Sequence, residues 1–586
     1  MNLSSSDGVA STFASKVVYQ IYPKSFYDSN GDGIGDLAGV TARLDYLARL
    51  GVDYLWLTPF FVSPQRDNGY DIADYRSIDP VFGTMDDFEE LVAAARARGI
   101  GIMLDMVFNH TSTEHEWFQR ALAGDERYQA YYFFRKGSSD GPPTNWISKF
   151  GGSAWEWVPS LQRWYLHLFD RTQADLDWSN PEVRAELVEI VRFWKDKGVS
   201  GFRFDVINLV SKPEVFEDDP SGDGRTFYTD GPRVHEFLRD LVVRAGIEDM
   251  VTVGEMSSTS LEACLGYTRP ENHELSMAFS FHHLKVDYRN GDKWSLADPD
   301  LAELQRIFSE WQEGMQAGGG WNALFWDNHD QPRAVSRFCD DGALRVPSAK
   351  MLAMVGQFMR GTPYIYQGDE FGMTNGHFHS IGFYRDVESL NYFRILQERG
   401  LSEQEALNVI AERSRDNGRL PMQWSSAPSA GFTTGEPWIP LACDAPGCDQ
   451  AKITVEAASV DDDSILAFYQ RLVELRHDMP VIATGKIRFL DAGAVPVISY
   501  VRFGDLPVGE RYDARNATDE DMLASGSLLV MGNFSAHPAA VGECVRRLLG
   551  RGGWEYLLSG YGDRDGAAGA EMLELRPYEG VVLIRR

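Results

Sequence analysis

The sequence predicts an α/β fold: a (β/α)8 TIM barrel with an inserted subdomain after its third strand and a C-terminal all-β sandwich domain. The main observation is that eight short apolar runs alternate with helical or irregular sequence, the pattern of parallel strands in βα units. Eight is the number of strands that closes such a barrel. The runs are Val17–Tyr22, Tyr54–Leu57, Gly101–Asn109, Gly201–Asp205, Val251–Glu255, Met277–Phe281, Leu324–Trp326 and Tyr364–Tyr366.

Two breaks in this rhythm predict the other domains. Residues 110–178 are rich in Trp and Tyr and contain no clean βα unit, which predicts an insert between the two parts of the barrel, residues 1–109 and 179–486. Residues 487–586 instead show short alternating strands separated by turn residues, as in an all-β domain. The strands expected there are Val495–Phe503, Ser527–Asn533 and Val581–Ile584.

Two helices of the barrel have clear start signals. Thr84, with Asp87 three positions later, predicts a capped helix that Gly99 ends. Asn180 followed by Pro181 predicts the start of a second helix, because Pro is favoured at the first helical position.

The charge balance bears on the partners of the protein. The 586 residues include 56 Lys and Arg against 86 Asp and Glu, a formal net charge of −30. Such a chain repels nucleic acid and anionic lipid, so we expect neither as a partner. Most of the acidity is explained by a solubilising surface, and an anionic substrate would need a local basic pocket.

Cysteine usage and the N-terminus bear on location. The five cysteines are odd in number and form no CxxC motif, so we expect unpaired thiols in a reducing compartment, with a Cys443–Cys448 bridge as the alternative. The N-terminus has no basic flank followed by an apolar stretch, and no window of about 18 apolar residues exists. We therefore expect a cytoplasmic protein without a membrane association; the sequence does not indicate an oligomeric state.

Three carboxylates follow strands of the predicted barrel, where active groups of such barrels stand. They are Asp205, Glu255 and Asp330, and His110, Arg203 and His329 lie at the same strand ends. The sequence has no phosphate-binding GxxxxGK[ST] loop, no HExxH motif and no Ser nucleophile elbow. Paired carboxylates at an aromatic-lined mouth are what glycoside hydrolysis requires.

These segments carry a family resemblance. DMVFNH (105–110), GFRFD (201–205), VGE (253–255) and FWDNHD (325–330) resemble the four ordered sequence blocks of the α-amylase family of glycoside hydrolases. VYQIYP (18–23), DNGYD (67–71) and SRDNGRLPMQW (414–424) are similar to its oligo-1,6-glucosidase branch. GEMSSTS (254–260), FHHLKVDY (281–288) and DNHDQPR (327–333) resemble the phosphotrehalases of that branch.

The resemblance implies a role for each residue. Asp205 would be the nucleophile that forms a covalent glucosyl-enzyme, with Arg203 stabilising its charge, and Glu255 would act as acid and then as base. Asp330 would not react but would bind sugar hydroxyls more tightly in the transition state. His110 and His329 would form hydrogen bonds with the same hydroxyls.

Further residues are expected at the far edge of the bound glucose. Asp67 and Arg419 would form a paired anchor there, suited to the removal of one terminal glucose, and Tyr70 would stack under the ring. Arg415 is a weaker candidate than Arg419 for this contact.

A metal loop is expected after the first strand. The candidate ligands Asp28, Asn30, Asp32, Ile34 and Asp36 alternate as in the opening of an EF-hand loop, with Gly33 at the sixth position. Gly39 stands where the bidentate Glu would be, so we expect a structural Ca²⁺ or Mg²⁺ of the kind that the oligo-1,6-glucosidase branch carries. The alternative is a turn that binds no ion.

Lys285 and Lys293 decide the expected substrate. In a chain this acidic, a basic cluster after the sixth strand predicts a place for a phosphate, although a solvated face is the alternative. Together with the resemblance to phosphotrehalases, this implies a small phosphorylated disaccharide, α,α-trehalose 6-phosphate, cleaved to glucose and glucose 6-phosphate. The runner-up is an oligo-1,6-glucosidase or α-glucosidase acting on neutral oligosaccharides. A non-catalytic ectodomain of a transporter is disfavoured, because those proteins carry a membrane anchor and lack the carboxylates.

Overall fold

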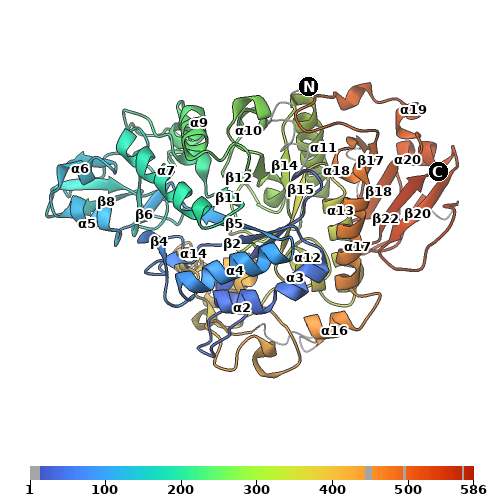
Figure 1. The fold of residues 1–586 in the computed structure, drawn as a ribbon, viewed down its shortest axis with the longest axis horizontal. Coiled ribbons are helices and arrows are strands. Elements are labelled where there is room, and N and C mark those ends of the chain that lie inside the picture. Colours follow the sequence, from blue (N-terminus) through green and yellow to red (C-terminus); the bar gives the residue numbers. More distant parts are fainter. Residues whose placement is uncertain (1–12, 442–451, 492–495, 570–572) are drawn as a thin grey trace.

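The computed structural model describes residues 13–441, 452–491, 496–569 and 573–586 (Figure 1). Eight parallel strands close into a barrel in the order β1-β15-β14-β13-β12-β11-β5-β2. Their bounds are Val18–Ile21 (β1), Tyr54–Leu57 (β2), Gly101–Met106 (β5), Gly201–Phe204 (β11), Val251–Met256 (β12), Met277–Ser280 (β13), Asn322–Leu324 (β14) and Thr362–Tyr366 (β15). Each strand lies within a few residues of its predicted position, and the predicted barrel is confirmed.

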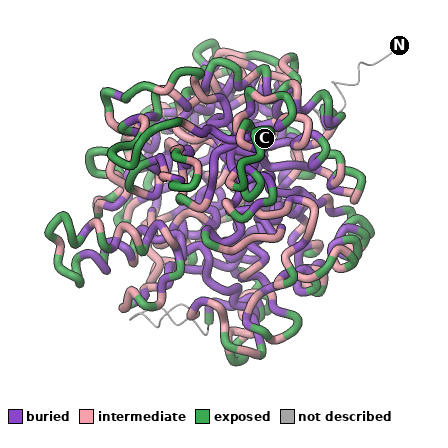
Figure 2. Tube along the Cα trace, turned by 90° about the vertical axis from the view of Figure 1, so that its left-hand side faces the viewer, coloured by how far each residue is buried: buried purple, intermediate pink, exposed green. Residues whose placement is uncertain are grey.

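Large apolar side chains fill the barrel interior. The ring of Trp56 on β2 packs against Phe279 on β13 with centroids 5.7 Å apart, and Phe279 packs against Tyr364 on β15 at 4.6 Å. Figure 2 shows the buried residues gathered inside the molecule and the exposed ones at its rim. The barrel is therefore a packed core, and a substrate can only reach its open end.

Helices surround the barrel, and both predicted start signals are confirmed. Thr84 and Asp87 form a reciprocal capping box at the start of α4 (Met85–Ala97), and Asn180 caps α7 (Pro181–Asp196). Other long helices are α9 (Val234–Ala245), α11 (Leu301–Gly318), α13 (Arg345–Gln357), α14 (Val387–Glu398), α15 (Glu403–Arg413) and α17 (Ile465–Asp478).

The segment after β5 leaves the barrel and returns to it. β6 (His110–Ser112) pairs antiparallel with β10 (Gln173–Asp175), and a three-stranded sheet lies between them in sequence, with the order β7-β9-β8. Its strands are Phe134–Lys136 (β7), Arg163–Leu166 (β9) and Trp155–Val158 (β8). This segment and the C-terminal sheet lie on opposite sides of the barrel in Figure 1.

The C-terminal part is an antiparallel sheet in the order β16-β17-β18-β22-β20. It packs on α13, where the Tyr500 hydroxyl donates to the carbonyl of Val355 at 2.6 Å. The strands are Lys486–Leu490 (β16), Val497–Phe503 (β17), Leu528–Asn533 (β18), Gly580–Arg585 (β22) and Trp554–Ser559 (β20), with β19 (Ala539–Ala540) and β21 (Glu574–Leu575) paired beside them.

Two expectations concern cysteines and membranes. Cys264, Cys339 and Cys544 are free thiols, whereas Cys443 and Cys448 lie outside the described residues. In the part of the chain that the structure describes, no helix combines the length and the apolar character needed to cross a bilayer.

Candidate active site

The ends of β11 and β12 bring two predicted catalytic carboxylates to one guanidinium group. Phe204 and Gly254 are register partners on these neighbouring strands, so the residues that follow them, Asp205 and Glu255, emerge side by side. Arg203 Nη1 donates to Asp205 Oδ1 at 2.7 Å, and Arg203 Nη2 contacts Glu255 Oε2. The arrangement places a nucleophile candidate and an acid candidate at one point of the barrel mouth.

A third acid, Asp105, completes this cluster. Its register partner on the adjacent strand is Arg203, which donates to Asp105 Oδ1 at 2.6 Å. The Tyr70 hydroxyl and the Trp56 indole donate to the other oxygen at 3.0 and 3.2 Å. Burial raises the pKa of Asp105 to about 7, although the charge of Arg203 opposes this shift. Asp105 therefore fixes the guanidinium group of Arg203 from the adjacent strand β5.

Asp330 and His329 follow β14 and lie at the same mouth. His329 Nδ1 is 2.7 Å from Gln20 Nε2, and its ring stacks on Tyr70 with centroids 5.1 Å apart. Burial lowers the pKa of His329 to about 3, so this imidazole is neutral at ordinary pH. Burial tends to raise the pKa of Asp330, but the adjacent imidazole and three guanidinium groups lower it well below its usual range. Asp330 is thus an ionised acceptor suited to sugar hydroxyls.

The expected anchor at the far edge of the glucose differs in one partner. Arg415 Nη2, not Arg419, lies against Asp67 Oδ1, at 2.9 Å. Arg419 Nη2 donates to Asp330 Oδ1 at 2.7 Å and its Nε donates to the carbonyl of His329 at 2.9 Å. Arg419 therefore does not pair with Asp67, whereas its expected contact with the bound glucose stays a prediction. Arg415 takes that place: it begins the helical turn Arg415–Arg419, and its guanidinium group lies between Asp67, Asp330 and Asp386.

His110 and Tyr70 are held in place by backbone contacts. His110 Nε2 is 3.0 Å from the carbonyl oxygen of Tyr70, so this nitrogen carries the proton and donates. Gln173, which the sequence did not single out, donates to Asp67 Oδ2 at 3.0 Å. Both His110 and Tyr70 line the same cavity as the catalytic carboxylates.

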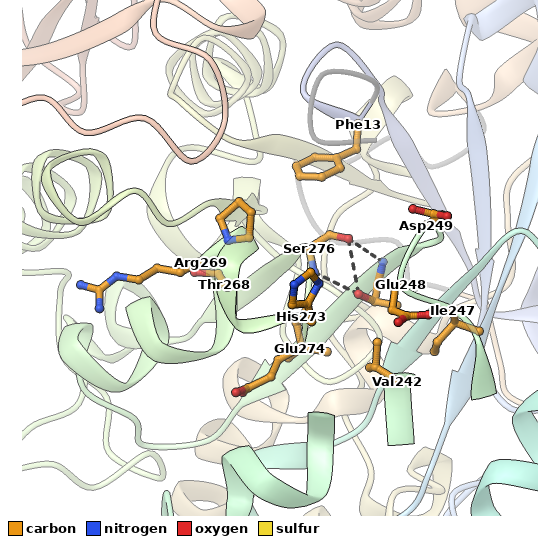
Figure 3. A pocket seen from close by; sticks show the side chains of 13 residues that line it. Phe13, Val242, Ile247, Glu248, Asp249, Thr268, Arg269, His273, Glu274 and Ser276 are labelled. Carbon is orange, nitrogen blue, oxygen red and sulfur yellow. Dashed lines mark hydrogen bonds between the residues drawn. The ribbon is translucent and has the colours of Figure 1, made fainter. Parts of the chain in front are cut away.

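This cavity has a volume of about 230 Å³, enough for part of a disaccharide. It is lined by Asp67, Tyr70, His110, Lys149, Phe150, Phe169, Asp205, Glu255, Lys285, Lys293, Asp330 and Arg415, among others. A second cavity, of about 240 Å³, lies at the beginnings of β12 and β13, where Phe13, Thr268, His273 and Ser276 line it (Figure 3). It holds none of the three predicted catalytic carboxylates, so the first cavity is the candidate active site.

The two predicted phosphate-binding lysines line the active-site cavity, but they differ. Lys293 Nζ pairs with Glu388 Oε2 at 2.7 Å, whereas no acidic side chain of the described residues lies within ion-pair distance of Lys285. Burial lowers the pKa of His282 to about 4 and that of His283 to about 3. Neither histidine therefore contributes positive charge to the predicted basic cluster.

The predicted metal loop is folded by its own side chains. Asp28 Oδ1 accepts from the amide of Asn30 at 3.0 Å, Asn30 Oδ1 accepts from Asp32 at 2.9 Å, and Asp32 Oδ1 accepts from Ile34 at 2.9 Å. Asp36 caps the helix that follows, accepting from the amide of Gly39. The oxygen donors suit a hard cation such as Ca²⁺. No three or more His, Cys, Asp or Glu side chains of the described chain converge as metal ligands, so the bound ion stays a prediction.

Several participants in the site besides Gln173 escaped the sequence reasoning. Asp105 carried a usable signal, because an acid inside the apolar run GIMLDM must find a buried partner. Asp386, which accepts from Arg415 Nη2 at 2.6 Å, lies in irregular sequence that offers no such signal. Lys149 belongs to the aromatic insert, whose placement over the barrel mouth only the tertiary structure reveals.

Comparison with known proteins agrees with this geometry. The family model of the alpha amylase catalytic domain matches residues 20–485. A trehalose-6-phosphate hydrolase of Escherichia coli (strain K12) is 51% identical over 571 residues, 96% of this chain and 97% of the relative. An oligo-1,6-glucosidase of Parageobacillus thermoglucosidasius is 43% identical over 572 residues, again 96% of this chain and 97% of the relative.

A solved structure extends the likeness to three dimensions. The crystal structure of Bacillus licheniformis trehalose-6-phosphate hydrolase is 48% identical, has a TM-score of 0.88, and the match covers 98% of this chain and 99% of that one. The matched family model, the closed barrel and the carboxylates at its strand ends all lead to one conclusion. The chain belongs to the alpha-amylase family and is a glycoside hydrolase.

Proposed function

We propose that this protein hydrolyses α,α-trehalose 6-phosphate to glucose and glucose 6-phosphate. The observation that carries the proposal is the convergence of Asp205 and Glu255 on Arg203 in a cavity that is also lined by lysines. Two of these, Lys149 and Lys285, have no carboxylate of the described residues within ion-pair distance. The two carboxylates can cleave a glycosidic bond, and the lysines can attract a phosphorylated sugar. Identity of about 50% over nearly the whole chain to curated hydrolases of this substrate supports the same assignment.

We assign the reaction to a double displacement with retention. The Asp205 carboxylate attacks the anomeric carbon of the unphosphorylated glucose, while Glu255 gives its proton to the bridging oxygen, and glucose 6-phosphate leaves. Glu255 then takes a proton from water, the water oxygen attacks the same carbon, and the bond to Asp205 breaks to release glucose. Arg203 contacts both carboxylates and fixes their orientation throughout.

A buried ion pair in the cavity wall explains why one glucose would be removed at a time. Asp67 and Arg415 form a buried pair at 2.9 Å, and Arg415 also reaches Asp330 at 3.2 Å. This pair blocks extension of a sugar chain beyond the glucose unit, so a terminal residue is the natural substrate unit. Phosphorylated sugars are metabolites of the cell interior, which supports the expectation of a cytoplasmic protein.

Glucose release from three substrates tests the proposal. The purified protein is incubated with trehalose 6-phosphate, with trehalose and with isomaltose, and kcat/KM is measured for each. We expect trehalose 6-phosphate to exceed trehalose by about tenfold or more, because one charge-assisted phosphate contact contributes about that factor. A preference for isomaltose would overturn the proposal in favour of a neutral oligo-1,6-glucosidase.

A further inference from the structure

We propose that Lys149, together with Lys285, binds the phosphate of the leaving sugar, and that Lys149 is a specificity-determining residue of this enzyme. This inference rests on the proposed function, because it concerns how the same cavity recognises the phosphorylated half of its substrate. It adds a residue of the inserted segment to a site otherwise built from the barrel.

The position of Lys149 matches the leaving-group side of the cavity. Lys149 Nζ is 3.1 Å from Ser257 Oγ, and Ser257 lies two residues after Glu255 at the end of β12. Glu255 protonates the oxygen of the departing sugar, so that sugar must lie beside it. The hydroxyl of Ser257 at the strand end and the ammonium group of Lys149 from the inserted segment are therefore donors on the side of the leaving sugar.

The backbone holds Lys149 firmly at this place. Its amide donates to the carbonyl of Leu168 at 2.8 Å, and the preceding Ser148 hydroxyl donates to the carbonyl of Phe169 at 2.7 Å. These bonds tie the segment before β8 to the chain that follows β9. A charged group on such a fixed backbone loses less conformational freedom when it binds a ligand.

The charge around Lys149 is uncompensated. The side chain is half-buried, and the described residues place no carboxylate within ion-pair distance of its amine or of Lys285. Burial, together with the positive charges of Arg225 and Lys285, lowers the pKa of Lys149 to about 7. Lys149, Lys285 and Arg225 are thus three neighbouring cations, and the two lysines have no acidic partner among the described residues. Binding of a doubly charged phosphate would stabilise the charged forms of these groups.

The other cations nearby are less available. Lys293 is neutralised by Glu388 at 2.7 Å, and Arg225 is exposed and paired with Asp223 at 2.9 Å. A neutral disaccharide would leave Lys149 and Lys285 crowded together and desolvated. The same residues thus favour the phosphorylated substrate and disfavour its neutral analogue.

Steady-state kinetics of three variants test the assignment. Lys149→Met removes the charge at similar volume, Lys149→Arg retains it, and Lys136→Met alters an exposed lysine of the same inserted segment as the control. We expect Lys149→Met to lower kcat/KM for trehalose 6-phosphate by about ten- to a hundredfold. Hydrolysis of p-nitrophenyl α-glucoside, which carries no phosphate, should fall much less than hydrolysis of trehalose 6-phosphate, and Lys149→Arg should recover part of the loss.

Product inhibition gives a second readout that needs no turnover of the phosphorylated substrate. With p-nitrophenyl α-glucoside as substrate, the inhibition constant for glucose 6-phosphate should rise in Lys149→Met, whereas that for glucose should not change. The inference is overturned if wild type prefers trehalose 6-phosphate to trehalose but Lys149→Met keeps both that preference and the inhibition constant. If wild type itself shows no such preference, the proposed function fails, and this inference fails with it.

Discussion

Arg415 donates to Asp67 across 2.9 Å, joining the loop before β4 (Asp74–Ile78) to a segment that lies 348 residues further along the chain. Both side chains are buried, and Arg415 also reaches Asp386 at 2.6 Å. Burial raises the pKa of Asp67 to about 7, and the charge of Arg415 opposes this shift. The guanidinium therefore stabilises the negative charge of the buried Asp67 in the wall of the cavity.

Replacing Arg415 tests this role. Arg415→Ala leaves the buried Asp67 without its ion-pair partner and Asp386 with only Arg419, at 3.7 Å. Removing one partner of a buried ion pair costs about 3–5 kcal/mol of unfolding free energy. The exposed pair of Arg98 with Asp45 serves as the control, because Arg98→Ala should cost no more than about 1 kcal/mol. Urea denaturation of both variants measures the difference. Equal stabilities would show that Arg415 does not compensate these acids.

The nucleophile assignment predicts a selective loss of turnover. Asp205→Asn should lower kcat by roughly four powers of ten or more, because the carboxylate that forms the covalent intermediate is gone. Thermal unfolding of the variant should remain close to that of wild type, and Asp45→Asn at an exposed position is the control for both measurements.

Chemical rescue makes this assignment specific. In Asp205→Ala, azide can enter the space of the carboxylate and attack the anomeric carbon of an activated α-glucoside from the opposite face. The expected product is the β-glucosyl azide. Near-wild-type turnover in Asp205→Asn, or an α-configured azide product, would exclude Asp205 as the nucleophile.

Much of the fold could be predicted because its signals are local. Each strand of the barrel is an apolar run bounded by turn or helix signals, and the capping box of Thr84 and Asp87 lies within four consecutive residues. The catalytic carboxylates follow strands in sequence, and the carboxyl ends of parallel strands meet at one mouth. Asp205, Glu255 and Asp330 therefore meet in one cavity as their sequence positions indicate.

The rest of the site depends on contacts between distant segments. Arg415 and Arg419 lie four residues apart in one motif, and only the path of the folded chain decides which of them meets Asp67. Lys293 looked equivalent to Lys285 in sequence until the structure placed Glu388, 95 residues away, against it. Lys149 had no local signal at all, because its significance comes from the position of the insert over the mouth.

His329 predicts a specific pH dependence of stability. Burial lowers its pKa to about 3 in the folded protein, whereas an unfolded His titrates near 6.5. Between these values the unfolded state binds more protons, so unfolding free energy falls as the pH falls below about 6.5. Because of this single group, the unfolding free energy at pH 5 should be about 2 kcal/mol lower than at pH 7.

The comparison of wild type with His329→Gln isolates this contribution. Urea titrations at pH 7 and at pH 5 should show that wild type loses about 2 kcal/mol more than the variant over this interval. Because Gln keeps a polar group beside Gln20, the substitution does not leave that amide without a partner. The same substitution at the exposed His537 is the control. Identical losses in wild type and His329→Gln would show that the buried imidazole is not kept neutral.

The loop from Asp28 to Asp36 provides the last prediction, a calcium-dependent gain in stability. Binding of one ion to the folded state alone adds about 2.7 kcal/mol when the free ion is at a hundredfold excess over its dissociation constant. Calorimetric unfolding in excess calcium and after chelation should therefore differ, and the transition should move to lower temperature without the ion.

A single substitution separates ion binding from the folding of the loop itself. In the protein, Asp32 Oδ1 accepts from the amide of Ile34 at 2.9 Å. Asp32→Asn keeps an oxygen that can accept this bond but removes a negative charge that a cation needs. The chelated variant should then unfold like chelated wild type, whereas its response to calcium should be weaker. Asp74→Asn is the matched control, since Asp74 accepts from the amide of Arg76 in the same way outside this loop. A wild-type transition that is insensitive to chelator would contradict the metal assignment, because Asx hydrogen bonds alone would then account for the fold of the loop.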